Sequence, residues 1–310
     1  MSETTPTGIM VMAYGTPETL ADVEPYYTHI RGGRKPSPEQ LADLIGRYEK
    51  VGGQTPLYEL TKGVADQLRA RLEHEFPGRY RVYLAMKHWH PYIAEVVPQI
   101  AADGIREVVG VVLAPHYSRY SLEGYRSYTE KALAQLDRPF SFRFVEHWHD
   151  HPLFRALITD RIRAALAEFP PEAQGQVAVL FSAHSLPEKI VAMGDPYVAQ
   201  LRESAAAISA LVGLREHRFC FQSAAPTPEP WLGPDIVDYL QTLHGEGVRY
   251  VLSVPFGFVA EHLEVLWDID TEAQAKARAL GITLRRIRMP NADPEFVEVI
   301  RAVVLESAGS

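Results

Sequence analysis

The sequence predicts an α/β fold of two similar domains, each with a four-stranded parallel β-sheet flanked by helices. Three observations predict it. Short runs rich in β-branched and aromatic residues alternate with longer segments whose apolar residues recur at helical spacing. Strands separated by helical crossovers form parallel sheets with helices on both faces. The runs also fall into two matching sets, and 310 residues are enough for about two domains that each bury a core.

Eight strands are predicted, four in each half of the chain. Those of the first half are residues 8–16, 79–88, 107–115 and 141–149, and those of the second half are residues 176–185, 217–224, 249–258 and 283–290. Helical periodicity is clearest between them, in segments 61–75, 152–168, 196–211 and 235–244. We therefore expect domains at 1–150 and 151–310, with the last helix packing back on the first domain.

The two halves resemble each other in the order of their predicted strands and in the amino-acid sequence at the strand ends. The third strand of the first half ends Val-Val-Leu-Ala-Pro-His at residues 111–116, and its counterpart ends Val-Leu-Ser-Val-Pro-Phe at residues 251–256. Strands two to four recur about 140 residues later and strand one about 168 residues later, so the first half carries about 30 extra residues. We interpret this pattern as a duplicated domain with an insertion. Two unrelated halves of the same architecture are the alternative.

The composition limits the class of protein. With 46% hydrophobic and 23% charged residues the chain reads as globular, and its net charge of −8 argues against general nucleic-acid binding. Cys220 is the single cysteine, which excludes an intrachain disulfide and a cluster held wholly by cysteines. No apolar run approaches the roughly 20 residues that span a bilayer, and the first residues lack a signal-peptide pattern. We expect a cytoplasmic enzyme with no transmembrane segment and no nucleic-acid partner.

The insertion, at about residues 26–57, is rich in glycine and positive charge. It holds Arg31-Gly-Gly-Arg-Lys-Pro36 and Arg47-Tyr-Glu-Lys-Val-Gly-Gly-Gln-Thr-Pro56. Glycines let the backbone approach a ligand, and arginines pair with carboxylates or phosphates. Neither stretch is a P-loop and no G-x-G-x-x-G follows the first strand, so a nucleotide cofactor is not supported. A basic surface loop is the alternative reading.

Ligands in such folds bind beyond the carboxyl ends of the strands, where this chain concentrates histidine, tyrosine and carboxylate side chains. His184 lies between two serines just beyond the apolar run 177–181, where an imidazole can accept a proton or bind a metal. A hydrogen-bonded structural histidine would look the same in the sequence. The pattern alone leaves both readings open.

A predicted helix after the seventh strand carries Glu264, Asp268 and Glu272 at i, i+4 and i+8. This spacing places the three carboxylates on one helical face. Such a row is either a solvated acidic face or a ladder that handles a divalent cation or relays protons.

A run of histidines lies at the end of the fourth strand. His147, His149 and His151 alternate, so in an extended chain all three side chains point the same way. They could bind zinc or nickel, or their proximity could be incidental. The zinc-protease motif H-E-x-x-H and the hydrolase elbow G-x-S-x-G do not occur in the sequence.

Together these motifs resemble the ferrochelatases. The resemblance rests on a few segments, which follow one another in the family's order along nearly the whole chain. They are Val11-Met-Ala-Tyr-Gly-Thr-Pro17, Tyr26-Tyr-Thr-His-Ile-Arg31, Leu113-Ala-Pro-His116, Leu180-Phe-Ser-Ala-His-Ser-Leu-Pro187, Phe221-Gln-Ser223, Pro230-Trp-Leu-Gly-Pro234 and Val254-Pro-Phe-Gly-Phe-Val-Ala-Glu-His-Leu-Glu264. Within the family the chain is most similar to the short bacterial type that inserts iron into coproporphyrin III.

The resemblance implies two Rossmann-type domains with a porphyrin cleft between them. It makes His184 and Glu264 the inner metal-binding and proton-accepting pair, with Asp268 and Glu272 continuing the acidic row outward. Tyr14 would approach the iron from the opposite face, a feature of the coproporphyrin enzymes. The positions that would contact the macrocycle or its propionates, besides Tyr14, are Arg31, Arg47, Tyr48, Thr55 and Tyr125.

The implied reaction inserts Fe(II), as a substrate, into coproporphyrin III and gives coproheme for haem biosynthesis. No tightly bound cofactor and no iron–sulfur cluster are implied. An iron donor and a downstream coproheme-processing enzyme are the implied partners. The alternatives are a protoporphyrin IX ferrochelatase, a related cobalt chelatase, a non-catalytic porphyrin or haem carrier, and a metal-storage or metal-delivery protein that uses the histidine run.

Overall fold

The computed structural model describes residues 5–225 and 227–309, which form two parallel four-stranded sheets. The first sheet has the order β2-β1-β3-β4, with β1 (Thr7–Ala13), β2 (Tyr80–Met86), β3 (Glu107–Val112) and β4 (Ser141–Val145). The second has the order β6-β5-β7-β8, with β5 (Ala178–His184), β6 (Arg218–Gln222), β7 (Tyr250–Val254) and β8 (Thr283–Arg286). The two orders are equivalent, and the predicted fold class is confirmed.

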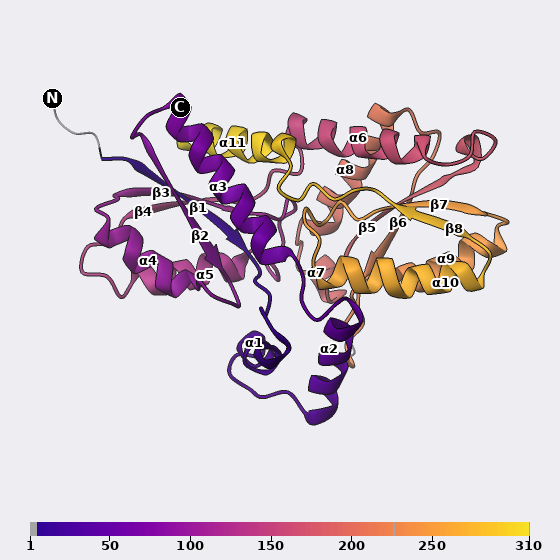
Figure 1. Cartoon of the computed structure of the whole chain (residues 1–310), viewed down its shortest axis with the longest axis horizontal. Helices are drawn as coiled ribbons and strands as arrows, with labels where there is room; N and C mark the ends of the chain where they lie inside the picture. Colours follow the sequence, from indigo (N-terminus) through magenta and orange to yellow (C-terminus); the bar gives the residue numbers. More distant parts are fainter. Residues whose placement is uncertain (1–4, 226, 310) are drawn as a thin grey trace.

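Helices cover both sheets (Figure 1). Those around the first sheet are α3 (Leu57–Glu75), α4 (Ile93–Ala102) and α5 (Glu123–Leu133). Those of the second half are α6 (Pro152–Ala167), α7 (Lys189–Ala192), α8 (Tyr197–Val212), α9 (Ile236–Gly245), the π-helix η3 (Val265–Ala273), α10 (Gln274–Ala279) and α11 (Pro294–Ala308). Short 3₁₀ turns occupy η1 (Leu20–Asp22) and η2 (Gln174–Gln176). In the described part of the chain no helix is long and apolar enough to cross a membrane.

The central strands are apolar because both of their faces are covered. In β1 six of seven residues are buried, and β1 lies between β2 and β3 with Ile9 in register with Val82 and Val109. Parallel strands covered by helices on both faces read as continuous apolar runs rather than as alternating ones. The apolar runs located the strands but did not mark where they end: the strand predicted at 141–149 stops at Val145, before the polar residues Glu146 and His147.

The insertion folds into two helices, α1 (Val23–Ile30) and α2 (Pro38–Lys50), which project away from the side that carries α6 and α11 (Figure 1). Ser37 caps α2: its side chain accepts a hydrogen bond from the Gln40 backbone amide, and the Gln40 side-chain oxygen accepts one from the Ser37 backbone amide. Pro38 adds a preset first turn. A basic loop is therefore only part of this segment, because half of it is helix.

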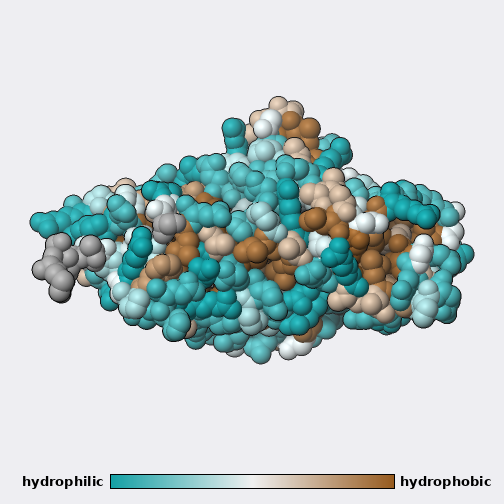
Figure 2. All heavy atoms as spheres, turned by 90° about the horizontal axis from the view of Figure 1, so that it is seen from above, coloured by the Kyte–Doolittle hydropathy of each residue, from teal (hydrophilic) through white to brown (hydrophobic). Residues whose placement is uncertain are grey.

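The last helix, α11, packs on the first half of the chain. Glu298 of α11 pairs with Arg71 of α3 at 3.0 Å, and Arg301 pairs with Glu75 at 3.0 Å. Phe296 and Ile300 of α11 belong to the same buried cluster as Val11 of β1. The face that bears α6 and α11 is mostly hydrophilic, with hydrophobic residues in patches between hydrophilic ones (Figure 2).

Candidate active site

The carboxyl ends of the neighbouring strands β5 and β7 bring His184 and Glu264 together. His184 is the last residue of β5, and Glu264 comes just before the π-helix that follows β7. The distance from His184 Nε2 to Glu264 Oε1 is 3.4 Å, and each side chain keeps about a third of its surface exposed. The Nδ1 atom of His184 hydrogen-bonds with the Ser185 carbonyl oxygen, which leaves Nε2 for the carboxylate. The two residues predicted as the inner pair therefore lie in contact.

His262 is a third member of this group that the sequence analysis did not single out. Its Nε2 lies 3.1 Å from Glu264 Oε2, and its Nδ1 lies 2.9 Å from the Ala260 carbonyl oxygen. Glu264 is thus held between two imidazoles. His262 is part of the segment Val254–Glu264 quoted above. It was overlooked because it precedes the helix whose acidic face was analysed.

The charges of the pair are set by their contact. Burial disfavours protonation of His184, but the Glu264 carboxylate, with help from the Ser185 carbonyl and the Asp268 charge, raises the pKa of His184 to about 9. Burial likewise disfavours ionisation of Glu264, but His184 and His262 hold the pKa of Glu264 well below its usual range. Near neutral pH the pair is therefore an imidazolium and a carboxylate that share one proton.

The acidic row follows this pair along a π-helix instead of the α-helix that was predicted. Glu264 is half-buried, Asp268 is only 7% exposed and Glu272 is exposed. The wider turns of a π-helix, with i to i+5 hydrogen bonds, still keep residues four apart close to one face. Burial, together with Glu264 and Glu272, raises the pKa of Asp268 to about 6, although its hydrogen bond from Ser223 opposes the shift. Asp268 can therefore exchange a proton near neutral pH.

Tyr14 follows β1 in the other half of the molecule and is 41% exposed. Its ring lies against His88 with centroids 4.5 Å apart, and Lys87 Nζ lies 5.7 Å from its centroid. Although the side chain is partly exposed, desolvation and then the Glu264 charge raise the pKa of Tyr14 above its ordinary value, so the phenol stays protonated at neutral pH. Tyr14 and Glu264 therefore influence each other although they come from different sheets.

Lys87 is a second group that the sequence analysis missed. Burial lowers its pKa to about 8, and its ammonium lies 5.0 Å from the Tyr125 ring centroid. It also donates a hydrogen bond to the Ser121 carbonyl oxygen at 3.3 Å. Lys87 directly follows β2, and its position at a strand end was the signal in the sequence that could have identified it.

The other predicted contacts divide into buried residues and partly exposed residues. Tyr48, Thr55 and Tyr125 are 2%, 8% and 4% exposed. Thr16 Oγ1 lies 2.9 Å from Thr55 Oγ1 and 3.4 Å from the Tyr48 hydroxyl, so these side chains fasten the insertion to the loop after β1.

Arg31 and Arg47 lie closer to the surface. Arg31 donates to the Arg34 carbonyl oxygen and its guanidinium lies 5.6 Å from the Tyr27 ring centroid. Arg47 pairs with Asp43 at 3.1 Å and lies 5.9 Å from the ring of Trp267, a residue of the π-helix. The insertion therefore reaches from the first half to the acidic row of the second.

The histidine run does not have the predicted arrangement. Because β4 ends at Val145, the run is not extended strand, and the expectation that its three side chains point one way is wrong. His151 Nδ1 instead accepts a hydrogen bond from the Leu153 amide at the start of α6, and its Nε2 lies 3.4 Å from Glu306.

Comparison with known proteins agrees with this geometry. A family model described as Ferrochelatase matches residues 6–308. A protein named Ferrochelatase from Herpetosiphon aurantiacus is 51% identical over 298 residues, covering 96% of this chain and 98% of that protein. Proteins named Coproporphyrin III ferrochelatase are 45% identical in Anoxybacillus flavithermus, with 96% and 95% covered, and 42% identical in Bacillus subtilis, with 97% and 98% covered.

Solved structures support the fold alone, because their sequences are distant. SirB from Bacillus subtilis with Fe³⁺ has a TM-score of 0.63 at 12% identity, with 98% of this chain and 96% of that chain covered. CbiX, described as the terminal enzyme for biosynthesis of siroheme in denitrifying bacteria, has a TM-score of 0.53 at 14% identity, with 96% and 98% covered.

Proposed function

This chain belongs to the ferrochelatase family, and from that premise we propose that it inserts Fe(II) into coproporphyrin III to give coproheme, releasing two protons. The observation that carries the proposal is the contact between His184 and Glu264 at 3.4 Å, with Asp268 and Glu272 leading outward from it. The substrate preference is supported by Tyr14 and by the names of the relatives that are 42–45% identical.

The chemistry needs groups that take up protons near the centre of the ring. A free-base porphyrin carries two pyrrole N–H protons, and the entering metal displaces both. Bending the ring exposes the nitrogen lone pairs, and binding energy from the periphery of the ring can supply that strain. An imidazole and a carboxylate also suit iron(II) without holding it permanently.

The proton on the inner pair must leave before His184 can present a lone pair to iron. With a pKa of about 9, His184 is protonated near neutral pH, so iron and the proton compete for Nε2. Asp268, with a pKa of about 6, is mostly ionised there and can accept that proton. The exposed Glu272 then offers a route to solvent.

Cationic groups match the carboxylate periphery of the proposed substrate. Arg31 and Arg47 in the insertion, with Lys87 after β2, supply positive charge on the side of the molecule that carries Tyr14. The proposed reaction uses iron as a substrate and needs no tightly bound cofactor or iron–sulfur cluster. We propose a place in haem biosynthesis in the cytoplasm, with an iron donor before this step and a coproheme-processing enzyme after it.

The direct test mixes the protein anaerobically with Fe(II) and coproporphyrin III and follows loss of the free-base absorption bands. We expect catalytic conversion above the protein-free rate, and faster conversion of this tetracarboxylate than of protoporphyrin IX when the two compete. Preference for the dicarboxylate would make the chain a protoporphyrin enzyme. Porphyrin binding without turnover would favour a carrier.

A further inference from the structure

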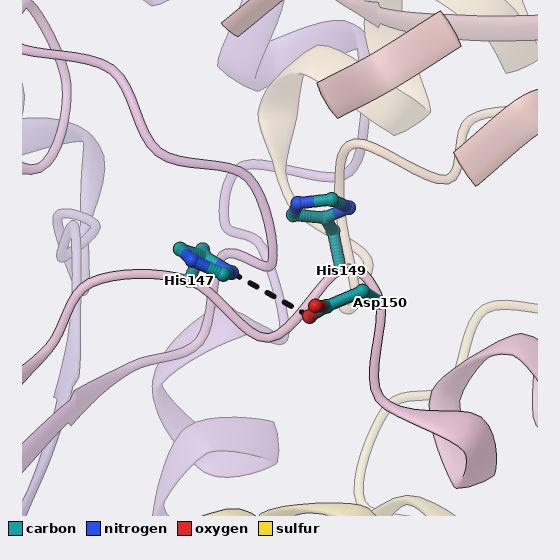
Figure 3. Close-up of side chains that lie close together, drawn as sticks. All are labelled: His147, His149 and Asp150. Atoms are coloured by element: carbon teal, nitrogen blue, oxygen red, sulfur yellow. Dashed lines mark ion pairs between the residues drawn. The ribbon is translucent and has the colours of Figure 1, made fainter. Parts of the chain in front are cut away.

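We propose that the loop after β4 binds a divalent transition-metal ion through His147, His149 and Asp150, at a site separate from the candidate active site. One ligand atom from each of these side chains lies within 4.8 Å of the others. His147 Nδ1 and Asp150 Oδ1 are 3.5 Å apart, as the dashed line in Figure 3 marks. Neither the insertion of iron nor the acidic row uses these residues.

The spacing fits a small ion. Zinc–nitrogen bonds of roughly 2.0–2.1 Å place tetrahedral ligand atoms about 3.3 Å apart. The 3.5 Å pair is already close to that value. His147 and Asp150 are exposed, so rotation of their side chains can shorten the remaining distances between ligand atoms. His149 is 3% exposed and provides the fixed ligand of the three.

The loop takes this shape because Trp148 turns inward. The Trp148 ring is 2% exposed, its Nε1 donates to the Val112 carbonyl oxygen at 3.0 Å, and its amide donates to the Pro115 carbonyl oxygen at 3.0 Å. The anchored tryptophan directs its two neighbours to the other side of the loop. His147, His149 and Asp150 are thereby gathered, whereas His151 enters the cap of α6.

A second layer of contacts orients the buried ligand. His149 Nδ1 lies 3.0 Å from Ser204 Oγ of α8, which leaves Nε2 as the coordinating atom. Ser204 Oγ also lies 3.2 Å from His116 Nε2, and the His116 ring stacks on His149 with centroids 5.4 Å apart. A hydrogen bond at the non-coordinating nitrogen fixes the tautomer and orientation of histidine ligands in metal sites. His149 therefore has the support that a metal ligand requires.

The donor set selects the kind of ion. Two imidazole nitrogens and one carboxylate oxygen favour zinc, cobalt, nickel or iron(II) over magnesium or calcium, which prefer oxygen ligands. Three protein ligands leave a position for water. All three ligands come from one short loop, so binding requires no movement between the halves of the molecule.

The test is a titration of the untagged protein with Co²⁺ in the absence of porphyrin, in a His184→Ala background that disables the inner pair. We expect one equivalent of Co²⁺ to bind, with an intense visible d–d spectrum, and excess Mg²⁺ to leave it in place. His147→Ala and Asp150→Asn, both at exposed positions, should each lower the affinity at least about tenfold. His151→Asn is the matched control, because it removes the third histidine of the run while asparagine still caps α6.

The proposal fails if Co²⁺ shows no saturable binding, or if His147→Ala and Asp150→Asn bind it as tightly as the control. In otherwise unchanged protein, His147→Ala should keep full porphyrin turnover. Since the titration contains no porphyrin, failure of the metal site and failure of the proposed chelatase reaction are separate outcomes.

Discussion

The two halves of the molecule share one strand order but hold different chemistry. β1 and β5 occupy the same place in their sheets, yet β1 is followed by Tyr14 whereas β5 ends at His184. His116 and Phe256, which follow β3 and β7 in equivalent motifs, meet across the halves with ring centroids 5.1 Å apart. In the proposed reaction the second half would provide the proton-accepting groups, and the first half a phenol, cations and the insertion. In the proposed reaction the two halves therefore form two sides of one site, and only the second half holds the reacting pair.

This comparison predicts that His184→Ala causes the largest loss of iron-insertion activity. Removing the imidazole should slow iron insertion by about 100- to 10,000-fold, as for other proton-transfer groups, while porphyrin binding persists. Stopped-flow absorbance with Fe(II) measures insertion, and porphyrin fluorescence quenching measures binding. If both properties disappeared together, His184 would be a folding or binding residue.

Glu264→Gln should have the second largest effect and slow iron insertion about 100-fold. The amide cannot hold a charge beside His184, so the pKa of His184 should fall from about 9 toward its ordinary value. In the variant this pKa, read by NMR titration of the imidazole, should move downward. An unmoved pKa would mean that the observed contact does not set the charge of the pair.

Asp268→Asn should mainly change how turnover and stability depend on pH. In the parent protein, turnover should fall as the pH drops through about 6, because protonated Asp268 no longer accepts a proton, and this limb should be absent from the variant. The raised pKa also means that charged Asp268 destabilises the folded state. That penalty is fully present above pH 6 and disappears as the pH falls toward the unfolded value near 4.

Asp268→Asn should therefore raise stability above pH 6 by at most about 3 kcal/mol, with no gain near pH 4. Urea unfolding at several pH values measures this. A pH-independent gain would indicate a packing effect and not a charge effect.

The smallest effect on turnover is expected for Tyr14, in the first half of the molecule. Tyr14→Phe should change turnover by less than about fivefold, roughly 1 kcal/mol, because no proton transfer is assigned to the phenol. It should instead alter the affinity for the iron product and the visible spectrum of that product. An unchanged spectrum would show that Tyr14 is not a ligand of the product iron, whereas a loss as large as that of His184→Ala would overturn the division of labour between the halves.

Much of this arrangement was predictable from the sequence, because apolar runs locate buried parallel strands and strand ends locate sites. His184 and the row from Glu264 to Glu272 were found in this way. The π-helix was not, since carboxylates four residues apart fit an α-helix equally well. Local alternation grouped His147 with His149 but misplaced His151, because the chain leaves the strand direction there and His151 caps α6. Ser204, which orients His149 from a helix more than 50 positions along the chain, has no local signal at all.

The packing of α11 on the first half has a consequence for biosynthesis. During translation β1 to β4 leave the ribosome early, but Phe296, Ile300 and their neighbours, which complete the core beside β3 and β4, emerge last. The first half therefore cannot reach its final packing on a partly made chain. α3, β3 and β4 acquire their finished support only when α11 has been synthesised, so a chain that lacks α11 should not complete the core of the first half.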